Sequence, residues 1–169
     1  HSFHARHRGR HRLHFSAFRF IALCAEGGAV SAKGDKAKGG IQVYKGATLV
    51  LQGGSIINGT DSYGGGVYVY QGAVFQMEGG AIEENSAEKN GGGVYAAGKF
   101  IMNGGRVSKN TCAYYGGGVY VVTTASFTMS DGVIGNNINT SYYGGGVYNS
   151  GNFVMEAGSI EGNVVRGYG

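Results

Sequence analysis

A five-residue motif, Gly-Gly-Gly-Val-Tyr, constrains the fold of this chain more than any other feature of its sequence. It occurs at residues 64–68, 91–95, 116–120 and 144–148, with a weaker copy at 38–44. Each copy is followed by a second motif, Phe-x-Met with an aliphatic residue and an Asn further on, at residues 75–85, 100–110, 127–137 and 153–163, with a degenerate form at 49–59. The first position of this second motif recurs at intervals of 26, 25, 27 and 26 residues. This period indicates stacked repeats that bury their apolar faces against one another.

The apolar residues inside each repeat alternate with polar residues. Val67 and Val69 are two positions apart, as are Phe75 and Met77, which is typical of short half-buried strands, and Ile82 begins a third strand. Stacking would place equivalent strands in parallel and form columns of like residues. Four apolar columns are expected: Ile41, Val67, Val94, Val119, Val147; Leu49, Phe75, Phe100, Phe127, Phe153; Leu51, Met77, Met102, Met129, Met155; and Ile56, Ile82, Val107, Ile134, Ile160. The pattern predicts an all-β fold, a right-handed parallel β-helix of about six coils.

The chain divides into three parts. We expect residues 1–11 to form a basic, poorly ordered leader, residues 12–37 a degenerate coil that caps the stack, and residues 38–169 the regular coils. External loops are expected between the Asn slot and the next glycines, where the repeat length varies. These loops span residues 86–90, 111–115 and 138–143.

The capping coil is aligned with the next coil by a constant shift of 26 residues. That shift pairs Phe15 with Ile41, Leu23 with Leu49, and Val30 with Ile56.

An asparagine ends the second motif in four coils, and the column reads Asn85, Asn110, Asn137, Asn163. A stacked side-chain amide can donate to one neighbour and accept from the other, and Asn tolerates the positive φ of a tight corner. We interpret the column as a structural ladder rather than a catalytic group.

The net charge of +4 comes from the leader. Residues 1–20 contain five arginines and no acid, whereas the other 149 residues carry nine basic and ten acidic side chains, a net charge of −1. A nucleic-acid-binding surface would need basic residues on a structured face, so we expect no nucleic-acid partner.

Histidine can bind a metal, and two cysteines can form a disulfide. His4, His7, His11 and His14 would share one face of a helix, a weak candidate for a metal site; we favour a frayed terminus and expect no metal and no cofactor. Cys24 and Cys112 are predicted to lie three coils apart, roughly 14 Å. That separation is too long for a disulfide, so both should be free thiols.

The two motifs resemble the right-handed parallel β-helix repeats of the polymorphic outer-membrane protein family and of related adhesin-like autotransporter passengers. The Gly-Gly-Val copies, such as Gly65-Gly66-Val67, resemble that family's Gly-Gly-Ala-aliphatic motif. The Ile/Val-x-x-Asn copies, such as residues 82–85, resemble its Phe-x-x-Asn motif, with Ile or Val in place of Phe. The resemblance covers residues 38–169 and implies a bacterial surface or secreted location.

Pectin-lyase-like enzymes share this fold, so a polysaccharide lyase or glycoside hydrolase is an alternative. A glycosidase needs two carboxylates about 5 to 9.5 Å apart, and a calcium-dependent lyase needs clustered acidic oxygens. Glu78 and Glu156 share one repeat slot, but they lie three coils apart, roughly 14 Å. Glu84 should instead pair with Lys109 on the next coil. We therefore expect no enzymatic activity.

Tyrosine is concentrated at two places in the repeat. Tyr68, Tyr95, Tyr120 and Tyr148 form one column, best explained as a stabilising aromatic ladder. The second set lies in the expected loops, where aromatic rings could contact a sugar or a protein. It comprises Tyr63, Tyr114, Tyr115, Tyr142 and Tyr143.

The sequence thus predicts a non-enzymatic cell-surface or secreted β-helix that acts as an adhesion or display scaffold. A surface glycan or a host protein would bind the loop tyrosines. A purely structural spacer remains the other alternative. No apolar run is long enough to span a membrane, and end-to-end self-association of the β-helix is also expected.

Overall fold

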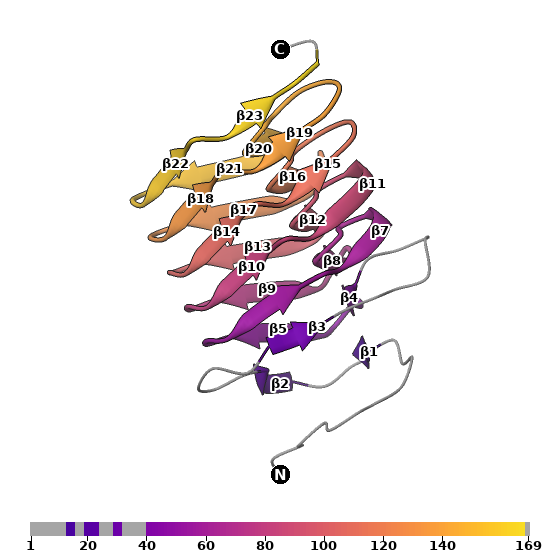
Figure 1. Ribbon diagram of the computed structural model, residues 1–169. Helices are drawn as coiled ribbons and strands as arrows, with labels where there is room; N and C mark the ends of the chain where they lie inside the picture. The colour runs from indigo at the N-terminus through magenta and orange to yellow at the C-terminus, as the bar shows by residue number, and fades with distance from the viewer. Residues whose placement is uncertain (1–12, 16–18, 24–28, 32–39, 168–169) are drawn as a thin grey trace.

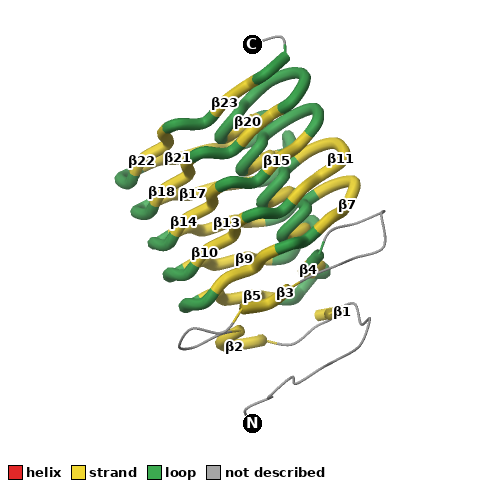
Figure 2. The backbone as a smooth tube through the Cα atoms, viewed as in Figure 1, coloured by secondary structure: helices red, strands yellow, loops and turns green. Residues whose placement is uncertain are grey.

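A computed structural model describes residues 13–15, 19–23, 29–31 and 40–167 of the chain. In it these residues form a parallel β-solenoid of about five turns, with a repeat of about 26 residues and no helix (Figure 1). The strands of successive turns lie above one another along the solenoid axis, and short loops turn the corners between them (Figure 2). The predicted all-β parallel fold is confirmed.

Four parallel sheets run along the axis. Sheet A contains β1 (Leu13–Phe15), β4 (Ile41–Val43), β8 (Val67–Val69), β12 (Val94–Ala96), β16 (Val119–Val121) and β20 (Val147–Asn149). Sheet B contains β2 (Arg19–Leu23), β5 (Thr48–Leu51), β9 (Val74–Met77), β13 (Lys99–Met102), β17 (Ser126–Met129) and β21 (Asn152–Met155). Sheet C contains β3 (Ala29–Ser31), β6 (Ser55–Ile57), β10 (Ala81–Glu83), β14 (Arg106–Ser108), β18 (Val133–Gly135) and β22 (Ser159–Glu161). Sheet D contains β7 (Thr60–Tyr63), β11 (Ser86–Asn90), β15 (Thr111–Cys112), β19 (Ile138–Asn139) and β23 (Val164–Val165).

Sheet D corrects the expectation of external loops at residues 86–90, 111–115 and 138–143. The whole of the first segment and the first two residues of the other two form strands that pair in parallel. Isolated bridges extend the pairing from Asn90 to Tyr115 and on to Tyr143. These segments differ in length and carry many polar residues, so their sequences lack the alternation of apolar and polar residues that indicates a strand. Pairing in register still satisfies their backbone groups.

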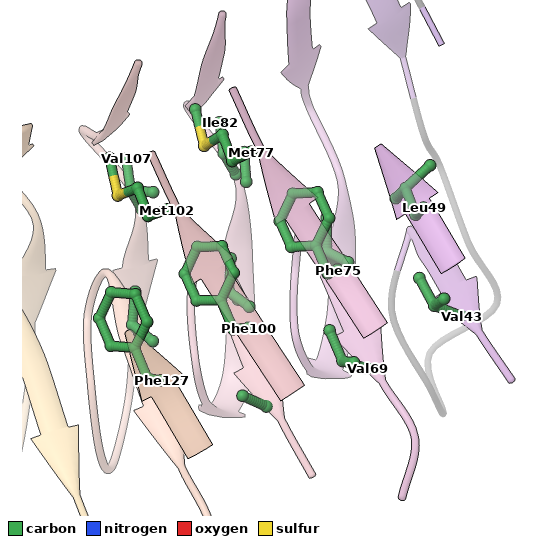
Figure 3. Packing of buried hydrophobic residues seen from close by; sticks show 14 of the residues in the cluster. Val43, Leu49, Val69, Phe75, Met77, Ile82, Phe100, Met102, Val107 and Phe127 are labelled. Carbon is green, nitrogen blue, oxygen red and sulfur yellow. The ribbon is translucent and has the colours of Figure 1, made fainter. Parts of the chain in front are cut away.

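The predicted columns are confirmed by the strand register. In sheet B, Phe75 pairs with Phe100, Phe100 with Phe127, and Phe127 with Phe153. The first three of these rings are fully buried and stack with centroid separations of 4.5 to 5.0 Å (Figure 3). The methionine column lies beside them, with Met77 and Met102 also fully buried. The interior is therefore a continuous apolar core, in which each large side chain contributes about 1.5 to 3 kcal/mol through burial.

The glycine run lets neighbouring turns approach closely. Gly91 has a φ of +66°, a conformation that side chains other than Asn and Asp rarely adopt. At Gly93, a Cβ atom would lie 2.7 Å from the Gly118 carbonyl oxygen and 2.8 Å from the Val107 side chain. A side chain there would push the turns apart, which explains why glycine repeats at this position.

The first coil pairs differently from the constant shift of 26 residues. Phe15 pairs with Val43 rather than Ile41, and Leu23 pairs with Leu51 rather than Leu49. Val30 pairs with Ile56, as predicted. The reason is an insertion: seven residues lead from Leu23 to Val30 where five lead from Leu51 to Ile56, so no single shift aligns both ends of the coil.

The coil count differs slightly from the six that were predicted. About five turns are described, and β1, β2 and β3 pair with the first regular strands of sheets A, B and C. The final described turn is covered on one side only. Met155 and Ile160, which continue buried columns, are therefore 42% and 38% exposed.

Candidate functional site

The tyrosines gather on one connected surface over sheets A and D. In β8, β12 and β16 the residues on either side of the central tyrosine point into the core, so the tyrosine ring lies on the outer face. The rings of Tyr68 and Tyr95 stack at 4.7 Å, and those of Tyr95 and Tyr120 at 5.1 Å. Tyr148 continues the column at 5.5 Å from Tyr120. The predicted aromatic ladder is confirmed.

A second row of tyrosines lies beside this ladder, at the end of sheet D. Tyr115 contacts Tyr148 with a centroid separation of 4.7 Å and a tilt of 43°, and it lies 6.3 Å from Tyr120. Tyr63 packs edge-on against Tyr95 at 5.3 Å, and the ammonium group of Lys89 lies over the Tyr63 ring, 5.2 Å from its centroid. Both rings are half-buried, so they join the ladder to the loops rather than standing free in solvent.

The most exposed part of the surface is formed by Tyr114, Tyr142 and Tyr143, which are 40%, 40% and 49% exposed. Tyr142 packs edge-on against Tyr114 at 5.2 Å, and Tyr143 stacks on Tyr115 at 6.2 Å. All five tyrosines predicted as binding residues therefore belong to the same surface. Only these three present large exposed areas to a partner.

Asn139 holds this exposed group in place, and sequence reasoning missed it. Its side chain is fully buried. The amide nitrogen donates to the carbonyl oxygens of Tyr114 (2.6 Å) and Tyr143 (2.7 Å), and the amide oxygen accepts from the backbone N–H groups of Ser141 and Tyr142 (2.9 Å each). Asn often bonds through its side chain to the backbone two residues further on, and this turn preference could have identified the residue.

The first rung of the ladder is a glutamine. Gln42 occupies the tyrosine position in β4 and is buried beneath two further tyrosines. The hydroxyl groups of Tyr44 and Tyr70 donate to its side-chain oxygen at 2.5 and 3.4 Å. Tyr44 stacks on Tyr70 at 4.7 Å, and Tyr70 contacts Tyr68 at 4.4 Å. The aromatic surface therefore extends over every regular coil of the solenoid.

Burial sets the electrostatics of the ladder. It raises the pKa of Tyr68, Tyr95 and Tyr120 above the ordinary value for a phenol, and neighbouring tyrosines raise these pKa values further. These three phenols are thus uncharged at neutral pH. The chemical character of the ladder is that of apolar rings with hydroxyl groups at their tips.

The asparagine column is a structural ladder, as predicted. The amide nitrogens of Asn85, Asn110 and Asn137 each donate to the amide oxygen of the next Asn at 2.9 to 3.0 Å. Each also donates to a backbone carbonyl of the preceding coil. One detail of the prediction was wrong, because positive φ occurs at the residue before each Asn, such as Lys109 with φ +56°. The backbone N–H groups of Asn85, Asn110 and Asn137 instead donate to the side-chain oxygen of the next Asn in the column.

Two of the described carboxylates form surface ion pairs. Glu84 lies 3.9 Å from Lys109, the pair that the sequence predicted, and Glu83 lies 3.2 Å from Arg106. Strand register keeps Glu83 and Glu161 three coils apart in one column. Within the described ranges, no three His, Cys, Asp or Glu residues come together as a metal site would require.

The cysteine and histidine predictions are tested only in part. Cys112 is a buried free thiol, and burial raises its pKa to about 12. Cys24, His4, His7 and His11 lie outside the described residues. His14 belongs to the strand β1, so it does not continue a helical stripe.

No protein-family model, curated protein or solved structure matches this chain. The described part of the chain contains no helix that is long and apolar enough to cross a membrane.

Proposed function

We propose that this protein is a non-enzymatic β-solenoid that displays a tyrosine surface for adhesion, either at a cell surface or in secreted form. The observation that carries the proposal is the exposed group of Tyr114, Tyr142 and Tyr143, held in a fixed arrangement by the buried Asn139. Tyrosine suits a contact surface because it combines a large rigid ring with a hydroxyl group and loses little conformational entropy on binding.

The scaffold supports this proposal. Each coil contacts only its neighbours, so a solenoid can present a long surface without a single compact core. The loop segments after β15 and β19 differ in length, yet their tyrosines still meet on one face. The proposed ligand is a surface glycan or a host protein.

The motif resemblance supports a finer proposal. Gly65-Gly66-Val67 and its copies, and residues 82–85 and their copies, resemble repeats of polymorphic outer-membrane proteins and adhesin-like autotransporter passengers. On that basis we infer a bacterial passenger-like segment located outside the cell.

A glycan and host-protein binding screen tests the proposal. The natural chain is compared with a variant carrying Tyr114→Ser, Tyr142→Ser and Tyr143→Ser. A matched control carries Lys99→Ser and Val133→Ser, which are exposed positions on sheets B and C. We expect the natural chain and the control to bind the same ligand and the tyrosine variant to lose that binding.

Two other results would contradict the proposal in different ways. Equal ligand retention by all three proteins would exclude these tyrosines as the binding surface, and no binding by any of them would favour a spacer. Depolymerisation of a polysaccharide by the natural chain would favour a lyase or a hydrolase.

A further inference from the structure

The tyrosine surface has a chemical property that does not depend on what it binds. Of the twelve tyrosines, Tyr168 alone lies outside the described residues. The other eleven are connected by ring contacts whose centroid separations range from 4.4 to 6.3 Å. The ladder alone would be enough to stabilise the stack of coils. The second row adds contacts in which phenol rings of successive coils meet at angles that differ from the nearly parallel stacking of the ladder.

We propose that this surface is a site of oxidative cross-linking, in which a one-electron oxidant joins Tyr115 to Tyr148 through a dityrosine bond. The oxidant class is a haem peroxidase with hydrogen peroxide. The product is a covalent bond between two successive coils of the same chain.

The coupling removes two hydrogen atoms from the pair of tyrosines. Each phenol loses one electron and its hydroxyl proton to the oxidant, which leaves two phenoxyl radicals. Their unpaired electrons form one carbon–carbon bond between ring carbons ortho to the hydroxyl groups, and each ortho hydrogen then moves to oxygen and restores a phenol. Two tyrosines and one hydrogen peroxide therefore give one dityrosine and two waters, and the protein loses two hydrogen atoms.

Ring tilt separates this pair from the ladder. In the ladder, neighbouring rings are nearly parallel, with interplanar angles of 7° to 24°, so their ortho carbons face one another across the full stacking distance. A dityrosine bond instead joins two rings edge to edge. Tyr115 and Tyr148 are 4.7 Å apart and already tilted by 43°, so a smaller rotation brings their ortho carbons together. Tyr68 and Tyr70 are tilted by the same 43° at 4.4 Å, but they are two residues apart in one coil, so a bond between them would not link coils.

The surroundings favour coupling within the chain. Tyr115 and Tyr148 are both half-buried, which shields their radicals from a second chain. The chain contains no tryptophan, a side chain that would compete for oxidation. Cys112 is 1% exposed and cannot readily quench a radical at the surface. Tyr115 also touches Tyr120 and Tyr143, so a radical formed elsewhere on the surface can reach it through neighbouring phenols.

The experiment uses the full chain at low concentration with a haem peroxidase and hydrogen peroxide. Dityrosine fluorescence, the intact mass of the monomer and the mapping of cross-linked peptides are measured. Three variants keep the aromatic ring and remove one hydroxyl group: Tyr115→Phe, Tyr148→Phe and, as a control at the other end of the second row, Tyr63→Phe. A urea-unfolded sample tests whether the fold directs the coupling.

We expect a monomer lighter by two hydrogen atoms, with Tyr115 and Tyr148 in the cross-linked peptide and a higher midpoint of thermal unfolding. The product should disappear in Tyr115→Phe and in Tyr148→Phe, and it should persist in Tyr63→Phe. Dityrosine found only between chains, an unchanged yield in Tyr115→Phe, or the same pattern of cross-links in the unfolded sample would overturn the proposal.

Discussion

Replacing Asn110 with Ala tests the asparagine ladder at its centre. The side chain is fully buried and makes four hydrogen bonds. Its nitrogen donates to the Asn137 side chain (3.0 Å) and to the Ile82 carbonyl (2.9 Å), and its oxygen accepts from the backbone N–H (3.0 Å) and the amide (2.9 Å) of Asn85. Alanine removes all four and fills none of the lost space.

The cost follows from the groups that lose partners. The Asn85 amide keeps its bonds to two backbone carbonyls, and the Asn137 oxygen keeps the bond from the Asn110 backbone. The buried N–H of Asn85 loses the acceptor that holds it. A buried polar group left unsatisfied costs about 1 to 3 kcal/mol, so we expect a loss of that size in the free energy of unfolding.

Urea unfolding followed by circular dichroism measures this loss. Asn103→Ala is the matched control, because Asn103 also links coils through two side-chain hydrogen bonds, to Glu78 (2.9 Å) and from Ser130 (2.8 Å), but is exposed. Water replaces those bonds, so the control should lose less than about 0.5 kcal/mol. Equal losses in the two variants would refute the reasoning that burial makes the ladder important.

Three further predictions concern the core, the ladder and the thiol. Phe100→Ala, which removes a fully buried ring stacked on both sides, should lower the free energy of unfolding by about 3 to 5 kcal/mol in urea titrations. Burial raises the pKa of Tyr95 above its unfolded value of about 10, so the folded state favours the neutral phenol. This stabilisation is complete below about pH 10 and is lost as the pH rises through the alkaline range. The urea midpoint should therefore fall less steeply with pH above about 10 in Tyr95→Phe than in the natural chain. In a Cys24→Ser background, Cys112 should resist a thiol reagent at pH 8 until the chain is unfolded, because burial raises its pKa to about 12; rapid labelling of the folded protein would contradict that prediction.

The stacked columns could be predicted from sequence because their chemistry repeats with the coil. Phe75 and Phe100 occupy the same slot, and so do Asn85 and Asn110, so the period alone identifies neighbours. The aromatic ladder followed from the same rule. These features depend on contacts between identical positions, which a repeated sequence specifies directly.

Features that break the repeat could not be predicted in this way. Asn139 shares its column with Ala87 and Cys112, so no repetition marks it as buried or as the residue that fixes the tyrosine loop. The tolerance of Asn for positive φ predicts the corner conformation at Asn110. The positive φ instead falls on Lys109. The backbone N–H of Asn110 donates to the side-chain oxygen of Asn137. Both errors concern hydrogen bonds that depend on the exact path of the chain.

Disulfide trapping across sheet B tests the register of the coils most directly. In a chain carrying Cys24→Ser and Cys112→Ala, one variant places cysteines at Lys99 and Ser126, which are paired in register between β13 and β17. In-register parallel neighbours lie about 4.8 Å apart, within reach of a disulfide. A second variant places them at Lys99 and Thr128, two residues further along the same outer face, roughly 8 Å away and out of reach. We predict rapid, complete oxidation of the first cysteine pair and little oxidation of the second. Equal trapping of both pairs, or preferential trapping of the second, would contradict the parallel stack on which the ladders and the tyrosine surface depend.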